Sequence, residues 1–250
     1  MSNHSGPAKW WTVNRKEGRE HIAKKGISQS GIVLNVDAGV TASYSGTGTT
    51  WNDLSGNNYH GTLTNGPTFN SSNGGNIVFD GIDDGIGITS TALLSVNAMT
   101  ISSWNKSANY AHNGFMFEKT TNGNVNTQYS LFFNSNSTIY YRTYGLSSTD
   151  LTHGWSGQNT IINNKWNNVV ATFDGTYKRI YINGILRATS GVLTGTVTQN
   201  TTGAAYIGVY GNFAGYRFNG SIAATVVYNR ALSADEIKRN YNARKRRFDL

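Results

Sequence analysis

The fold is decided by residues 165–189, KWNNVVATFDGTYKRIYINGILRAT. Within this stretch, residues 169–173 and 177–182 each split into two alternating sets of side chains, and a period of two is typical of β-strands. The pairs Asp174-Gly175 and Asn183-Gly184 end these runs, and both tolerate the positive φ angles of two-residue hairpin turns. We therefore predict an antiparallel meander of three strands, with the third beginning at Ile185.

The same alternation recurs along the chain between loops rich in Gly and Asn, which predicts an all-β, antiparallel two-sheet jelly-roll sandwich. One short C-terminal helix is expected, because Ser233 and Glu236 form a capping box, with Leu232 and Ile237 as its hydrophobic staple. The other predicted strands cover residues 32–34, 77–79, 86–88, 99–104, 115–118, 129–133, 139–144, 205–209 and 221–228.

The composition describes a chain of 250 residues with only 14% charged side chains, against about 25% in typical soluble domains. It has no cysteine, which excludes disulfides and thiolate metal sites and is consistent with a reducing compartment. No apolar run approaches the roughly 20 residues of a membrane span, and residues 1–11 lack the apolar core of a secretory signal. We therefore expect no membrane partner.

The formal net charge of +8 is concentrated at the two ends of the chain. Residues 1–30 and residues 239–250 each carry +4, which leaves residues 31–238 neutral. The charged ends predict a basic N-terminal arm over residues 1–30 and a basic C-terminal tail over residues 244–250. The predicted jelly-roll domain lies between them, over residues 31–243. The arm is expected to dock on a neighbouring subunit, and the alternative is a disordered basic leader.

Partner binding is expected at these two ends, through cationic side chains and nearby aromatic rings. The run 244–247 would touch nucleic acid only through phosphate charge, so no specific nucleic acid is predicted. The expected partner-binding residues are Trp10, Trp11, Arg15, Lys16, Lys24, Lys25, Arg244, Lys245, Arg246, Arg247 and Phe248.

Four segments resemble the laminin-G-like, concanavalin-A-type jelly-roll family: residues 77–88, 99–106, 165–186 and 205–242. Residues 34–69 are similar to a version of this domain common in bacteriophage structural proteins. That resemblance implies a non-catalytic structural or decoration protein on the capsid or tail of a virion. Its expected partners are other virion proteins, or further copies of itself in a homo-oligomer.

The resemblance also implies a structural calcium, because some members of the family bind one through acidic residues. The candidate ligands here are Asp80, Asp83 and Asp84, since calcium takes six to eight oxygen ligands and closely spaced carboxylates supply several of them. The alternative is that Asp80 begins a turn and the other two acids form a solvated tip.

Carbohydrate binding is the alternative function, as a lectin-like module that adheres to host surface glycans. Its candidate residues are Tyr140, Tyr141, Tyr144 and Trp155, which lie on or near one predicted strand beside loops rich in Asn and Gly. The competing interpretation is that aromatic residues spaced along a strand pack across strands or within the core.

Catalysis is not expected. Glycoside hydrolysis requires two carboxylates that flank the bond, and the body of the chain holds only two glutamates, Glu118 and Glu236. Glu236 is already explained by the helix cap, and the Glu-x-Asp-x-x-Glu cluster of glucanases with this fold does not occur. The five histidines are scattered, without the spacing of a zinc site.

Overall fold

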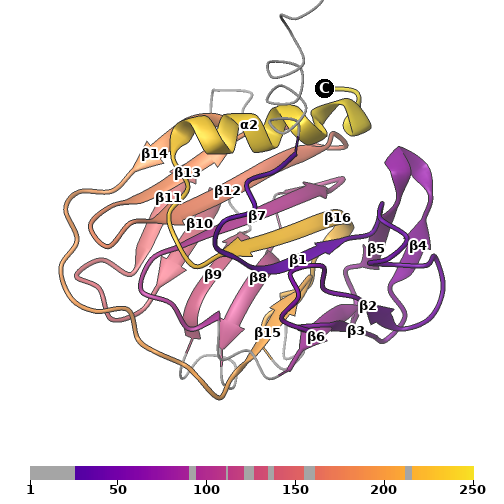
Figure 1. The fold of residues 1–250 in the computed structure, drawn as a ribbon, viewed down its shortest axis with the longest axis horizontal. Coiled ribbons are helices and arrows are strands. Elements are labelled where there is room, and N and C mark those ends of the chain that lie inside the picture. Colours follow the sequence, from indigo (N-terminus) through magenta and orange to yellow (C-terminus); the bar gives the residue numbers. More distant parts are fainter. Residues whose placement is uncertain are drawn as a thin grey trace, which may run out of the picture.

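The computed structural model describes residues 26–89, 94–110, 112–120, 127–134, 138–154, 161–211 and 216–250. Two antiparallel sheets pack face to face as a sandwich, and a short C-terminal helix lies across one of them (Figure 1). The predicted fold class is confirmed. None of the helices in the described ranges combines the length and the apolar character that a membrane span needs.

The first sheet, sheet A, has the strand order β14-β13-β12-β7-β16-β5-β4. The ten residues of β16 serve two neighbours in turn, because β5 pairs with residues 219–222 and β1 pairs with residues 224–228. The strands of sheet A are β1 (Ile32–Asp37), β4 (Thr68–Asn70), β5 (Asn76–Asp80), β7 (Met99–Lys106), β12 (Asn167–Phe173), β13 (Lys178–Ile182), β14 (Ile185–Thr189) and β16 (Asn219–Tyr228).

The second sheet, sheet B, has the order β11-β10-β9-β8-β15-β6-β3-β2. Its central strands are buried along their whole length, while β10 alternates between buried and partly exposed residues. The strands of sheet B are β2 (Thr50–Trp51), β3 (Gly61–Thr64), β6 (Gly85–Ile88), β8 (Gly114–Thr120), β9 (Thr127–Phe133), β10 (Thr138–Thr143), β11 (Asp150–Gly154) and β15 (Ala204–Ile207).

The predicted meander is present as β12, β13 and β14, but its two turns differ. At Asn183-Gly184 both residues have positive φ and the flanking residues pair, so this is the expected two-residue turn. At Asp174-Gly175 the connection is longer, because the first cross-strand pair is Phe173 with Lys178. The Asp174 side chain accepts hydrogen bonds from two backbone N–H groups within this turn and so stabilises the longer loop.

The core between the sheets is one cluster of apolar side chains drawn from both of them, including Ile101, Phe117, Leu131 and Val169. The opposite, outer face of sheet A is also apolar, and it is covered by helix α2 (Ala234–Arg244) and the short 3₁₀ helix η3 (Lys245–Phe248). The predicted capping box of Ser233 and Glu236 is present. Helix α2 lies across sheet A in Figure 1.

The structure corrects the expectation of a free C-terminal tail over residues 244–250. Phe248 is buried, and its ring stacks on Trp104 at 4.3 Å and contacts Trp166 at 4.7 Å between ring centroids. Arg244 and Arg247 form ion pairs with the buried Asp37 at 3.3 and 2.5 Å. Aromatic burial and ion pairing therefore hold this segment on its own chain, so these three side chains are not exposed for a partner.

Other predicted partner residues remain on the surface or fall outside the described ranges. Arg246 is exposed and Lys245 is partly exposed, on the segment that follows α2. The candidates Trp10, Trp11, Arg15, Lys16, Lys24 and Lys25 lie outside the described residues. The described chain begins beside α2, where the Ser28 backbone N–H donates to Asn240 at 2.8 Å and Ile27 packs on the cluster under the helix.

Candidate functional site

The predicted glycan-binding residues separate onto different surfaces. Tyr140 and Tyr144 are partly exposed on the outer side of sheet B, but Tyr141 is fully buried in the core. The prediction for Tyr141 is therefore wrong, because adjacent residues of a strand point to opposite faces. Burial also raises the pKa of Tyr141 well above its ordinary value. Trp155 lies outside the described residues.

Tyr140 belongs to a row of aromatic rings that crosses sheet B. Cross-strand pairing places Tyr140 opposite Phe132, and Phe132 opposite Phe115. The rings stack in the same order, with centroids 5.0 Å apart for Tyr140–Phe132 and 4.6 Å for Phe132–Phe115. Aromatic pairs at these separations stabilise each other beyond their buried area, so the row is a rigid base.

Two further tyrosines form the side of this base next to β15. The Tyr210 ring lies 4.8 Å from Phe115, and the Tyr216 ring lies 5.6 Å from Tyr210. They come from two segments that run side by side, since Val209 pairs with Arg217 in an isolated β-bridge. Tyr210 is nearly buried, whereas Tyr216 is 53% exposed and presents its ring to solvent.

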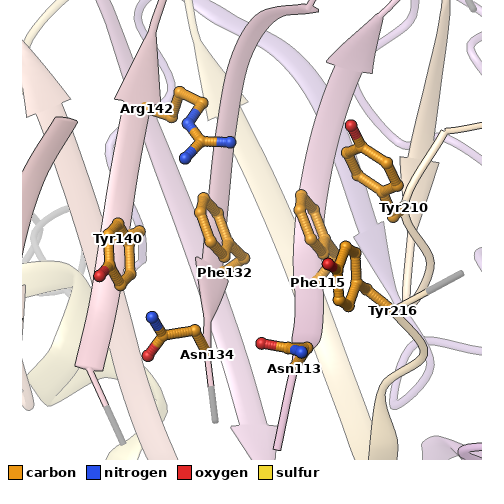
Figure 2. A pocket seen from close by; sticks show the side chains of 8 residues that line it. All are labelled: Asn113, Phe115, Phe132, Asn134, Tyr140, Arg142, Tyr210 and Tyr216. Carbon is orange, nitrogen blue, oxygen red and sulfur yellow. The ribbon is translucent and has the colours of Figure 1, made fainter. Parts of the chain in front are cut away.

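Together these residues line a groove with a cavity volume of about 340 Å³, at the lower end of the range of small-molecule sites. Figure 2 shows the rings side by side, with Arg142 at one end of the groove and Asn134 and Asn113 at the other. The groove thus combines ring surfaces with amide and guanidinium groups. The residues in the described ranges that line it are Asn113, Phe115, Phe132, Asn134, Tyr140, Arg142, Tyr210 and Tyr216.

The charge of Arg142 is balanced within the protein. Its Nε and Nη2 atoms donate to the two carboxylate oxygens of Asp150 at 2.8 and 3.0 Å, a bidentate ion pair. These hydrogen bonds raise the pKa of Arg142 above its ordinary value. The guanidinium carbon also lies 5.0 Å from the centre of the Phe132 ring, a cation–π contact that fixes the side chain over the row.

The backbone of Tyr216 is strained. Its φ angle is +39°, a region that bulky side chains rarely adopt and that costs of the order of 1–3 kcal/mol. A half-exposed ring gains little from burial, so packing alone does not account for a tyrosine at this position. Strain of this kind is concentrated at ligand sites, which marks Tyr216 as the side chain most suited to contact a ligand.

Of the sequence-predicted glycan-binding residues that the structure describes, Tyr140 lines this groove, and Tyr144 lies near Arg142 and Tyr210. The remaining lining residues were missed. Phe115 and Phe132 stand in strands that the sequence predicts, but only the pairing of β8 with β9 and of β9 with β10 brings them beside Tyr140. Tyr216 comes from a loop, for which alternation gives no signal.

The predicted calcium ligands Asp80, Asp83 and Asp84 do come together, with carboxylate oxygens within 4.8 Å of one another. Hydrogen bonds from backbone N–H groups, that of Ile82 foremost, lower the pKa of Asp80, whereas burial raises the pKa of Asp84. Asp80 and Asp84 each already accept a backbone N–H. The donor set suits an oxygen-seeking cation, and calcium binding here stays a prediction.

Neither glutamate of the body forms part of an evident catalytic pair. Glu236 accepts from Ser233 N–H in the helix cap and from the Arg230 guanidinium at 2.6 and 2.8 Å, and these bonds with Arg230 lower its pKa to about 2. Glu118 is completely buried on β8. The rings, amides and guanidinium of the groove offer apolar surfaces and hydrogen-bonding groups to a ligand.

The fold is shared with parts of larger proteins of known structure, although sequence identity is low. The sialidase of Trypanosoma rangeli in complex with the inhibitor DANA has 17% identity and a TM-score of 0.62, over 86% of this chain and 33% of that chain. The binding domain of Paraclostridial Mosquitocidal Protein 1 has 16% identity and a TM-score of 0.65, over 86% of this chain and 52% of that chain. This chain therefore spans a third to a half of these structures.

A third structure matches over nearly its whole length. Domain 4 of AbnA, an extracellular arabinanase from Geobacillus stearothermophilus solved in complex with arabinotriose, has 18% identity and a TM-score of 0.63. It covers 84% of this chain, and this chain covers 98% of it. At such identities these likenesses show the fold alone. The comparison with curated protein sequences found no match.

At the level of sequence families, residues 79–238 match the family Laminin_G_3, described as the concanavalin A-like lectin/glucanases superfamily. This match confirms the laminin-G-like resemblance of the sequence, while the bacteriophage setting stays a prediction. The matched residues run from β5 into α2 and make up most of the sandwich. The chain therefore belongs to the concanavalin A-like lectin/glucanases superfamily.

Proposed function

We propose that this protein is a carbohydrate-binding module whose groove on the outer face of sheet B takes a neutral oligosaccharide. The observation that carries the proposal is Tyr216, a half-exposed aromatic ring held in a strained backbone at the rim of a polar groove. An aromatic face covers the apolar side of a sugar ring, and amide and guanidinium groups orient its hydroxyls.

The charge balance of the groove favours a neutral ligand over an acidic one. Arg142 is the one cationic side chain among the described residues that line the groove, and its bidentate pair with Asp150 already neutralises it. An acidic sugar would have to compete with Asp150 for the guanidinium. Hydroxyl groups do not need such an exchange, since they add hydrogen bonds to a group that stays paired.

The known structures with this fold include complexes with a neutral sugar and with a sialylated one. The arabinanase domain is bound to a neutral trisaccharide, and the mosquitocidal protein match is a binding domain. Another match, the binding domain of botulinum neurotoxin DC, was solved in complex with SialylT. These proteins make a carbohydrate the first ligand class to test.

The test is a glycan array that contains arabinan and other neutral oligosaccharides beside sialylated ones, followed by calorimetry with the best neutral binder. We expect Tyr216→Ala and Tyr140→Ala each to weaken binding at least tenfold, about 1.4 kcal/mol, through loss of a ring contact. The matched control is Tyr177→Ala, a partly exposed tyrosine at the turn between β12 and β13 of sheet A. Unchanged affinity in Tyr216→Ala, or no neutral glycan on the array, would contradict the proposal.

A second proposal concerns how the module is attached, and it retains the predicted virion role. Exposed or partly exposed cations lie on α2 and just after it, at Lys238, Arg239, Lys245 and Arg246. Ser28, which lies close in sequence to the predicted basic arm, also contacts this helix through Asn240. A cationic surface on the sheet A side would leave the groove on sheet B facing outward.

Attachment through the N-terminal segment is tested by deletion of residues 1–26 followed by measurement of association with phage capsids or tails. We expect the shortened chain to fold, because residues 32–248 form both sheets and the C-terminal helices, and to lose its association with particles. Assembly of the shortened chain at the level of the full chain would contradict this role. The glycan array measures the groove separately, so either proposal can fail while the other holds.

A further inference from the structure

A buried carboxylate lies on the same face of sheet B as the groove. Glu118 is opposite Ser130 of β9 in the strand register, and Ser130 is opposite Arg142 of β10. Phe115 and Phe132 form the adjacent aromatic row on these strands. Glu118 is completely shielded from solvent, yet it is not part of the groove lining. A buried acid needs hydrogen-bond partners, because an unpaired one is costly to the fold.

The partners of Glu118 connect strand β8 to the tyrosine side of the groove. Its Oε2 atom accepts the backbone N–H of Gly211 at 2.6 Å, and its Oε1 atom accepts the hydroxyl of Thr127 at 3.2 Å. Gly211 directly follows Tyr210, whose ring packs on both Phe115 and Tyr216. The Gly211 N–H bond is therefore a direct link between the sheet and the segment that carries Tyr210.

We propose that Glu118 is a positioning residue for the groove, whose carboxylate holds the Gly211 N–H and thereby fixes Tyr210 and Tyr216 against the aromatic row. The inference rests on the proposed carbohydrate-binding function. A carboxylate accepts a shorter and stronger hydrogen bond than a carboxylic acid does. The position of these two tyrosines, and with it the affinity of the groove, therefore depends on whether Glu118 is ionised.

Glu118 changes its charge near neutral pH, within the range in which binding can be measured. Burial raises its pKa to about 7, and the bonds from Gly211 and Thr127 and the charge of Arg142 oppose that rise. Two titratable tyrosines lie near Glu118: Tyr206, which is paired with it on β15, and Tyr210. Two charged side chains are also close, but Asp150 neutralises Arg142, and Lys119 donates its Nζ to the Gly203 carbonyl at 2.8 Å. The carboxylate form, with the stronger bond to Gly211, predominates above pH 7.

The first test needs no ligand and uses nuclear magnetic resonance of the full ¹⁵N-labelled chain between pH 5 and pH 9. We expect the Gly211 amide proton to shift with a midpoint near pH 7, and the shift to vanish in Glu118→Gln, which keeps the shape and an acceptor oxygen. Thr127→Val removes one hydrogen bond to the carboxylate, so it should move the midpoint to higher pH. A Gly211 amide that does not titrate, or that titrates equally in Glu118→Gln, overturns the proposal.

The second test measures the affinity for the array-selected neutral oligosaccharide at pH 6 and pH 8. We expect about threefold tighter binding at pH 8 for the native chain, a part of the difference between charged and neutral hydrogen bonds. Glu118→Gln should show equal affinity at both pH values. Binding with the same pH dependence in both proteins overturns the inference and leaves the proposed function intact. Titration of Gly211 without any glycan binding supports the positioning role and removes the proposed function.

Discussion

The two outer faces of the sandwich carry similar aromatic clusters, but one cluster is covered by another segment of the chain and the other is open. On sheet A, Trp104 stacks on Phe248 and Tyr241, and the C-terminal helices cover the cluster. On sheet B, Phe132 stacks on Phe115 and Tyr140 in the same manner, but the row forms the base of an open groove. Stacked rings on a strand face therefore do not indicate a ligand site by themselves. What distinguishes the faces is whether another segment of the chain covers them.

The ion pairs on the two faces follow the same division. On sheet A, Asp37 is almost completely buried between Arg244 and Arg247, and the Arg247 guanidinium also donates to the carbonyls of Asn73 and Gly75. On sheet B, Arg142 and Asp150 are each a little under a third exposed at the groove. The first set of charges closes a surface, whereas the second borders a space that a ligand can enter.

The largest effect on stability is expected when Phe248, which covers the aromatic cluster on sheet A, is removed. Phe248→Ala should lower the free energy of unfolding by about 3–5 kcal/mol, because it removes a buried ring that stacks on Trp104 and contacts Trp166. Leu250→Ala is the matched control, since Leu250 is 41% exposed two residues further on. Urea unfolding followed by tryptophan fluorescence measures both. A loss below 1 kcal/mol in Phe248→Ala would mean that the tail is not part of the fold.

The next effect concerns the buried charges of that same face. Asp37→Asn leaves Arg244 and Arg247 without their carboxylate, and breaking a buried ion pair typically costs about 3 kcal/mol. The exposed pair of Arg179 with Asp174 is the comparison, where Asp174→Asn should cost at most about 1 kcal/mol. Equal urea midpoints for the two variants would show that Asp37 does not anchor the C-terminal segment.

The contrast between the faces also explains what the sequence could predict. Alternation in 165–189 and the capping box at Ser233 are local patterns, and the strands and the helix that they predict are present. The cover on sheet A depends on the contact of Phe248 with Trp104, and these residues are 144 positions apart. The basic residues around Phe248 indicated a tail instead, because a run of charges is typical of an exposed segment. The groove likewise depends on strand pairing, which local patterns do not define.

Errors in the candidate site have the same physical origin. Tyr140 and Tyr141 are adjacent residues of the same type. Only the register of β10 against β9 shows that Tyr140 faces the groove and Tyr141 the core. Tyr216 could not be found by alternation, because its importance lies in a positive φ angle and an exposed ring. The sequence suggests only a catalytic acid as a role for Glu118. Its contact with Gly211 could not be predicted, because it joins residues 93 positions apart.

A smaller effect is expected in the pH dependence of stability, and it is specific to the groove side. The folded-state pKa of Glu118 is raised to about 7, so folding becomes less favourable as the pH rises from about 4.5 to 7 and levels off above. At 1.36 kcal/mol per pKa unit, the decline amounts to about 1–3 kcal/mol. Glu118→Gln should remove this component, so urea unfolding at pH 5 and pH 8 should show the variant gaining relative to the native chain at pH 8. A pH-independent difference between the two proteins would contradict the raised pKa.

The smallest change in stability is expected at Tyr216. This prediction separates the open face of sheet B from the covered face of sheet A most clearly. Tyr216→Asn places at this position a residue that tolerates positive φ, so relief of backbone strain should offset the lost ring contacts and leave stability within about 1 kcal/mol of the native value. The same substitution removes the exposed ring of the groove and should abolish oligosaccharide binding. Phe248→Ala should behave in the opposite way, with a large loss of stability and, in the fraction that remains folded, an unchanged groove. A Tyr216→Asn variant that unfolds like Phe248→Ala would show that the strained tyrosine serves the fold rather than a ligand.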